Sequence, residues 1–125
     1  MREHDIKRAL DRAKEIEFEI IVDYTYLMEL AARANTALYN VHGKTYTVGN
    51  IANTIYVASG SSVDWVKGEL RVPYTFVMEL RHKRNMGMLV PPSEIIPCGE
   101  EVWAFHKVVA RQVIKDNEEI ISMSW

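Results

Sequence analysis

The sequence predicts one α/β domain, or one piece of a larger one, and three observations lead to this fold class. Apolar residues recur at helical spacing over the first forty residues and again near the carboxyl end. Between these stretches, the run VPYTFVMELR from Val72 to Arg81 has the β-branched and aromatic composition of a strand. No repeat or linker divides the 125 residues, of which 48% are hydrophobic, enough to build a core.

Two amphipathic helices are expected to open the chain. From Ile6 to Ile20, apolar residues alternate with charged ones at spacings of three and four. A second such run extends from Tyr24 to Val41 and ends at His42-Gly43, where glycine suits a left-handed helix stop.

The middle of the chain predicts shorter elements. After Gly43, KTYTV has β-forming composition, and GNIANTIYVASGSS is typical of a structured loop. SVDWVKGEL favours a short helix capped by Ser61 or Ser62, followed by the strand from Val72.

A last long helix is expected near the carboxyl end. LVPPSEIIPCG is interpreted as a connection punctuated by proline. The helix then begins at about Glu100, with the acidic pair Glu100 and Glu101 at its favourable amino end.

Composition narrows the function classes. Fifteen basic and seventeen acidic residues leave a net charge of -2, so neither nucleic acid nor an anionic membrane is an expected partner. Apolar runs fall short of the roughly 20 residues that cross a bilayer, and the charged start does not resemble a secretory signal. Cys98 is the only cysteine, which excludes an intrachain disulfide and a cysteine-based metal cluster.

No local motif for a metal site is found around the four histidines. None of them begins an H-x-x-E or H-E-x-x-H pattern. Glu79 and His82 come nearest, but residues three apart on a strand point to opposite faces, so His82 is interpreted as a solvated turn residue. Phosphate-loop and nucleophile-elbow motifs are also missing.

Two side chains stand out as candidate functional residues. Glu79 places a carboxylate in an apolar run, so it is either a working group or the solvated end of a strand that pairs with Arg81 or Lys83. Tyr56, in TIYVASG, is either a mobile phenol that meets a ligand or a half-buried packing residue.

Several motifs in order resemble the C-terminal third of the zinc carboxypeptidases of the carboxypeptidase A/B type. They are GKTYTVGNIANTIYVASGSSVDW, VPYTFVMELR and GMLVPPSEIIPCGEEVWAFHKVV, and HGKTYTVGN looks most like the invertebrate branch. The resemblance runs from about Asp23 to Ile114. It divides the chain into residues 1–22, an amphipathic helical extension without a clear family match, and residues 23–125, a carboxypeptidase-like segment.

The resemblance implies roles for seven residues. Glu79 falls on the glutamate that works as general base with the zinc-bound water, and Tyr56 falls on the mobile tyrosine that closes over the substrate. Val63 falls on the position that is acidic in enzymes selective for C-terminal Lys or Arg, so an aliphatic or aromatic preference is implied. The substrate pocket is implied to comprise Ile51, Ile55, Ala58, Val63 and Val77. Ser61 replaces a common glycine and Lys67 a common aromatic residue, which implies a narrower or reshaped pocket.

The resemblance also implies zinc as the family cofactor, yet no ligand set is found in this chain. The family's histidine and glutamate ligands, and the groups that grip the substrate carboxylate, lie N-terminal to the part that is similar here. A general base without these groups lacks most of the transition-state stabilisation, so the chain alone is expected to be inactive. Family members of this type are typically secreted, and the compartment of this chain stays open.

Three hypotheses follow. The chain is a segment of a metallocarboxypeptidase that hydrolyses single C-terminal residues from peptides, a non-catalytic peptide-binding or interaction protein of that family, or a gene fragment without a role. The implied fold is the C-terminal portion of a mixed-sheet, helix-flanked α/β domain with an incomplete sheet. Exposed sheet edges would then favour self-association unless the first helix covers them.

Overall fold

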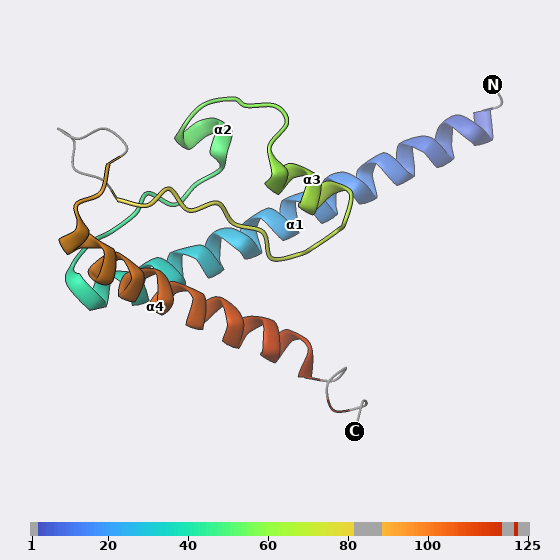
Figure 1. Cartoon of the computed structure of the whole chain (residues 1–125). Helices are drawn as coiled ribbons and strands as arrows, with labels where there is room; N and C mark the ends of the chain where they lie inside the picture. Colours follow the sequence, from blue (N-terminus) through green and yellow to red (C-terminus); the bar gives the residue numbers. More distant parts are fainter. Residues whose placement is uncertain (1–2, 82–88, 119–121, 123–125) are drawn as a thin grey trace.

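Two long helices and two short ones make up the regular structure. The computed structural model describes residues 3–81, 89–118 and 122. Helix α1 (Glu3–His42) and helix α4 (Pro92–Asp116) cross each other, and α2 (Ile51–Thr54) and α3 (Ser62–Gly68) lie on the chain between them (Figure 1). Within this described part, no helix is both long and apolar enough to cross a membrane.

Helix α1 is a single helix of 40 residues, so the prediction of two opening helices was wrong. Residues 21–23, Ile-Val-Asp, contain neither the glycine nor the proline that would interrupt a helix. The predicted end is confirmed. Gly43 adopts φ +69°, and its N–H donates to the carbonyl of Tyr39 at 2.7 Å.

Helix α4 begins at Pro92, eight residues before the predicted start at Glu100. A proline in the first turn fits a helix because the N–H that it lacks has no partner there. Pro97 lies inside the helix, at a cost that the packing of α4 outweighs. Glu101 therefore lies in the body of the helix and is fully buried.

The predicted α/β fold with an incomplete mixed sheet was wrong, because the described residues contain helices and irregular chain but no strand. KTYTV and residues 73–81 have strand composition but pair with no neighbouring strand among these residues. β-branched and aromatic residues favour strands because their side chains pack well on a sheet surface. In this chain the same side chains pack on helices instead. The expected self-association through exposed sheet edges therefore has no support, because the described residues form no sheet.

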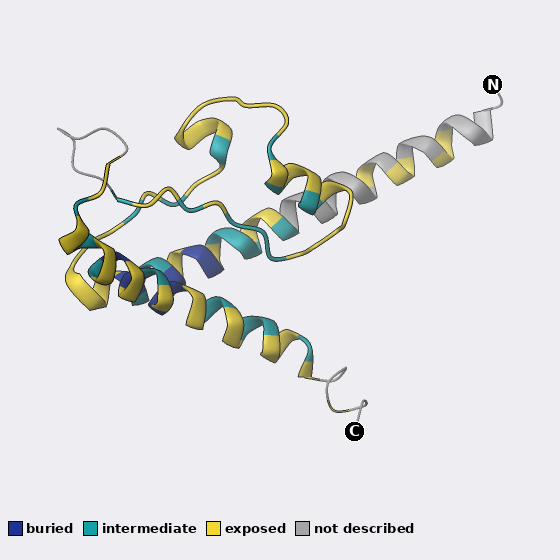
Figure 2. Ribbon diagram, viewed as in Figure 1, coloured by how far each residue is buried: buried dark blue, intermediate teal, exposed yellow. Residues whose placement is uncertain are grey.

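The core lies where α1 and α4 cross (Figure 2). Ala34 and Leu38 of α1 are fully buried against Phe105 of α4. Met78 and Tyr46 from the intervening chain pack on this cluster. The ring of Phe76 meets that of Phe105 edge to face, with 5.9 Å between ring centroids. The irregular segment that follows α3 is thus held against both long helices.

Candidate functional site

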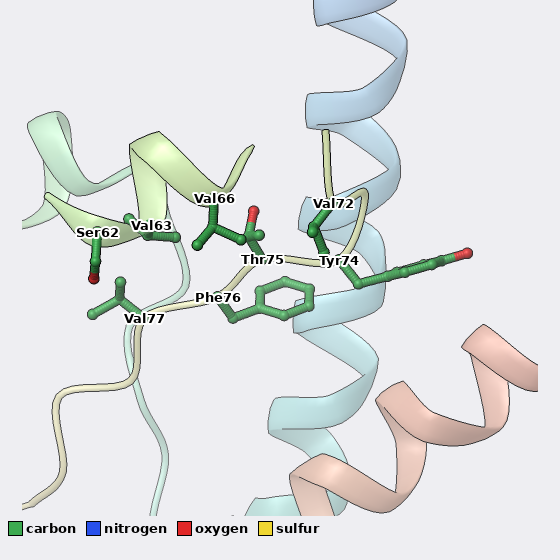
Figure 3. A pocket seen from close by; sticks show the side chains of 8 residues that line it. All are labelled: Ser62, Val63, Val66, Val72, Tyr74, Thr75, Phe76 and Val77. Carbon is green, nitrogen blue, oxygen red and sulfur yellow. The ribbon is translucent and has the colours of Figure 1, made fainter. Parts of the chain in front are cut away.

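An open, mainly apolar hollow lies between α3 and the chain that follows it (Figure 3). Its volume is about 320 Å³, in the range of small-molecule sites. The lining residues come from the start and middle of α3 and from residues 72–77: Ser62, Val63, Val66, Val72, Tyr74, Thr75, Phe76 and Val77. None of these side chains carries a formal charge at neutral pH, so the hollow suits an apolar group.

Local folding around Arg71 brings the two walls together. Helix α3 starts after Ser61, which occupies the N-cap position without a side-chain capping bond. Arg71 then adopts φ +53°, a left-handed conformation that turns the chain back along α3. The N–H of Val72 donates to the carbonyl of Val66 at 3.3 Å. The amine of Lys67 donates to the carbonyl of Pro73 at 2.8 Å.

Lys67 also pairs with Asp23 of α1. Its amine is therefore directed to the backbone of Pro73 and to α1, and Lys67 is not one of the residues that line the hollow.

Of the residues that the resemblance placed at the substrate, two meet in this hollow. Val63 of α3 and Val77 of the following segment both line it (Figure 3). Ile51, Ile55 and Ala58 do not line it; they lie in α2 and the loop after it. The structure thus brings together part of the expected pocket.

Glu79 and Tyr56 are both open to solvent. Glu79 follows Val77 by two residues, and no described residue forms a hydrogen bond or ion pair with it. Arg81, one of its two expected partners, pairs with Glu94 and Glu101 instead, while Lys83 and His82 lie outside the described residues. Tyr56 has 66% of its surface exposed, so it does not pack as a half-buried residue.

A partly buried ionic cluster holds the chain just beyond Glu79. Nη1 of Arg81 lies 3.1 Å from Oε2 of Glu94, and Nε lies 3.3 Å from Oε2 of Glu101. The contact with Glu101 has ion-pair distance without hydrogen-bond geometry, and the Glu101 side chain is fully buried. The backbone N–H of Arg81 donates to the hydroxyl of Tyr46, and burial raises the pKa of that phenol.

A second polar cluster anchors the other end of the segment. The hydroxyl of Tyr74 donates to Oδ2 of Asp116 at 2.5 Å, and that of Tyr26 donates to the same oxygen. Gln112 donates to Oδ1 at 2.7 Å. The bond from Tyr26, followed by the bond from Tyr74, lowers the pKa of the Asp116 carboxyl. The bond that each phenol makes to Asp116 raises the pKa of that phenol. The segment is thereby tied to α4 near both of its ends and to α1 near one.

Sequence reasoning did not identify these two clusters. A helical signal existed for Glu101, because Cys98, Glu101 and Phe105 recur at spacings of three and four and share the buried side of α4. The tyrosines had no such signal, since Tyr26 and Tyr74 reach Asp116 across 90 and 42 residues of sequence.

The described residues do not fit a metal centre on their own. No group of three or more His, Cys, Asp and Glu side chains among them lies close enough to hold an ion. His42 and Glu100 make a pair only, with Nε2 and Oε2 2.7 Å apart. No chemical step is therefore assigned to a metal held by these residues.

Comparison with known proteins defines the class. Residues 9–105 match the zinc carboxypeptidase family, which is most of the chain, so the chain belongs to that family. Carboxypeptidase B of Astacus astacus is 48% identical over 91 residues, 73% of this chain and 30% of that protein. A metallocarboxypeptidase A-like protein of Trichophyton verrucosum is 46% identical over 62% of this chain and 18% of its own length. Carboxypeptidase A2 of Rattus norvegicus is 41% identical over 73% of this chain and 22% of its own length.

The identities confirm the resemblance to zinc carboxypeptidases, and the covered fractions show that this chain corresponds to only part of each relative. The chain spans less than a third of the length of each of these relatives. Zinc is the cofactor that the family name implies, and carboxyl ends of peptides or proteins are what the family acts on.

Proposed function

We propose that this chain contributes the specificity pocket and the general base of a zinc carboxypeptidase domain that releases single aliphatic or aromatic residues from peptide C-termini. The observation that carries the proposal is the uncharged hollow in which Val63 and Val77 meet from two elements, in a chain of this family. An apolar C-terminal side chain gains free energy by leaving water for such a lining.

Glu79 is the proposed general base. It accepts a proton from the attacking water and passes it to the leaving amine. Its exposure in this chain leaves the carboxylate free for that role, and the anchored Arg81 two residues later fixes the local backbone. Tyr56, exposed on the loop after α2, closes over the bound peptide, with Ile51, Ile55 and Ala58 completing the pocket as the loop moves.

The catalytic and substrate-binding groups lie in two parts of the domain. Residues 23–125 supply the pocket and the base, and the described part of residues 1–22 forms the start of α1, where the family match begins at residue 9. The zinc ligands and the groups that hold the peptide carboxylate belong to polypeptide outside this chain, because the matched relatives are more than three times as long as the matched segment.

A graft tests this function. The matched segment of the Astacus astacus carboxypeptidase B is replaced by the corresponding residues of this chain, and release of C-terminal Phe, Leu and Arg from matched peptides is measured. The expected result is a preference for Phe and Leu, which Val63→Asp shifts toward Arg by roughly tenfold or more because a carboxylate pairs with the guanidinium. A folded graft that releases none of the three, or that prefers Arg with Val63 in place, would refute the proposal.

A second function is favoured by one observation: described residues of this chain line the hollow, whereas no three-ligand group is found among the described residues. On this alternative, the chain binds free apolar C-termini without cleaving them. Calorimetric titration of the chain with a peptide ending in Phe, beside the same peptide with a C-terminal Arg, tests it. Binding of the Phe peptide that Val63→Asp abolishes, without product formation in added zinc, supports the alternative; equal affinity for both peptides excludes it.

A further inference from the structure

Helix α4 carries a second apolar side that nothing in the described chain covers. Its buried side holds Cys98, Ala104 and Phe105. The opposite side carries apolar residues at intervals of seven, seven and four. We call this side the α4 outer face; it comprises Ile96, Trp103, Ala110 and Ile114. Three of these side chains are strongly exposed, Ile96 by 72%, Trp103 by 64% and Ile114 by 55%. A helix with apolar residues on both sides is typical of one that is buried on both sides.

The accessible surface of the whole chain supports the same interpretation. The accessible area is 10391 Å², whereas a compact monomer of 14.4 kDa exposes about 6,800 Å². The excess is several times the roughly 800 Å² that each partner of a standard protein interface buries. An excess of this size is enough for the chain to bury several such interfaces.

We infer that the α4 outer face is a docking surface for the part of a carboxypeptidase domain that the matched relatives carry outside the matched segment. This inference rests on the proposed function, because it names the partner of the same site. The Astacus astacus relative matches 73% of this chain, yet more than two thirds of that relative lies outside the match. In each matched relative, these additional residues belong to the same polypeptide as the matched segment. The occupant is thus a carboxypeptidase remainder rather than a second copy of this chain.

Co-expression with residue-specific footprinting tests the docking surface. The full chain is co-expressed with a tagged fragment of the Astacus astacus carboxypeptidase B that comprises the residues outside the match. Hydroxyl-radical oxidation of Trp103 is then compared by mass spectrometry between the purified chain and the complex. Trp65 of α3, 56% exposed, is the matched internal control. We expect a one-to-one complex in which Trp103 oxidises at least fivefold more slowly and Trp65 changes by less than twofold.

Substitution provides the second arm. Trp103→Glu is expected to lower the affinity of the complex at least tenfold, because burying an unpaired carboxylate is costly. Trp65→Glu is expected to leave this affinity close to that of the unchanged chain. Circular dichroism establishes that each variant keeps its helix content. Failure to co-purify, equal oxidation of Trp103 in chain and complex, or dimerisation of the chain alone with Trp103 protected would each overturn the inference.

The two proposals fail separately. A complex that protects Trp103 but releases no Phe from peptides upholds the docking surface and refutes the proposed function. Release of Phe by a complex in which Trp103 remains as reactive as in the free chain upholds the function and refutes the docking surface.

Discussion

Arg81 and Glu101 show how a single buried pair organises the chain next to the proposed base. The carboxylate of Glu101 is fully buried and the Arg81 side chain is 19% exposed, so the Glu101 charge depends on Arg81 for compensation. Desolvation makes such a pair a weak source of net stability, but the loss of one partner is costly. The pair therefore fixes the position of the backbone two residues after Glu79.

Arg81→Met is expected to lower the free energy of unfolding by about 3–5 kcal/mol, because it leaves the Glu101 charge buried and unpaired. The double variant Arg81→Met/Glu101→Leu is expected to recover most of that loss. Urea denaturation of the unchanged chain, of Arg81→Met and Glu101→Leu separately, and of the double variant measures both effects. Arg111→Met, at an exposed site on the same helix as Glu101, is the control and is expected to change stability by less than about 0.5 kcal/mol. Equal losses in the single and double variants would contradict the pairing.

At the scale of elements, helices were predictable and their partners were not. The segment SVDWVKGEL with its serine cap predicted α3 correctly, and apolar spacing with a glycine stop predicted the C-terminal end of α1. The strand prediction failed because a strand requires a backbone partner, which composition cannot supply. The start of α4 was missed because prolines were interpreted as breaks, although Pro92 stands where a helix tolerates one.

For the candidate site, the sequence predicted pocket residues but not the contacts that position them. Val63 and Val77 come from two separate elements, and the resemblance, rather than any local motif, placed both at the substrate before the structure brought them together. The contacts that position the segment carrying Val77 and Glu79 join residues distant in sequence, such as Tyr26 and Asp116. The spacing of apolar residues does not predict such contacts.

The Asp116 cluster joins three elements and makes their association depend on pH. The pKa of Asp116 is lowered in the folded chain, so its contribution to stability is present above the unfolded value of about 3.9 and is lost as pH falls through the folded value. The pKa values of Tyr26 and Tyr74 are raised, so their contribution is present below about 10 and is lost as pH rises through the folded values.

Asp116→Asn is accordingly expected to flatten the dependence of the thermal midpoint on pH at both ends of this window. Asp11→Asn, at an exposed position on α1, is the matched control and should keep the original profile. Thermal unfolding followed by circular dichroism between about pH 3 and about pH 11, an interval that includes the unfolded pKa values of Asp and Tyr, measures both variants. A profile of Asp116→Asn that matches the unchanged chain would show that the cluster does not link the elements.

The crossing of α1 and α4 can be tested at neighbouring positions of one helix. Leu38 is fully buried and Tyr39 is 52% exposed. Leu38→Ala is expected to cost about 2–5 kcal/mol through lost burial and a cavity beside Phe105. Tyr39→Ala is expected to cost less than about 1 kcal/mol. Urea denaturation compares them, and similar losses at the two positions would contradict the assigned crossing.

For the molecule as a whole, a small core and a large accessible surface describe a part of a carboxypeptidase domain. The buried apolar residues gather at one helix crossing, while the hollow, Glu79 and the α4 outer face all remain open. These three features are the proposed pocket, the proposed base and the inferred docking surface.

The central claim is that Glu79 is the general base, and turnover in the graft into the Astacus astacus carboxypeptidase B tests it most directly. The rate of Phe release is measured for the graft, for its Glu79→Gln variant and for Glu69→Gln, an exposed control at the end of α3. We predict that Glu79→Gln lowers kcat by roughly 100-fold or more with little change in KM, while Glu69→Gln retains the activity of the graft. A Glu79→Gln graft that keeps kcat within about threefold would contradict the account.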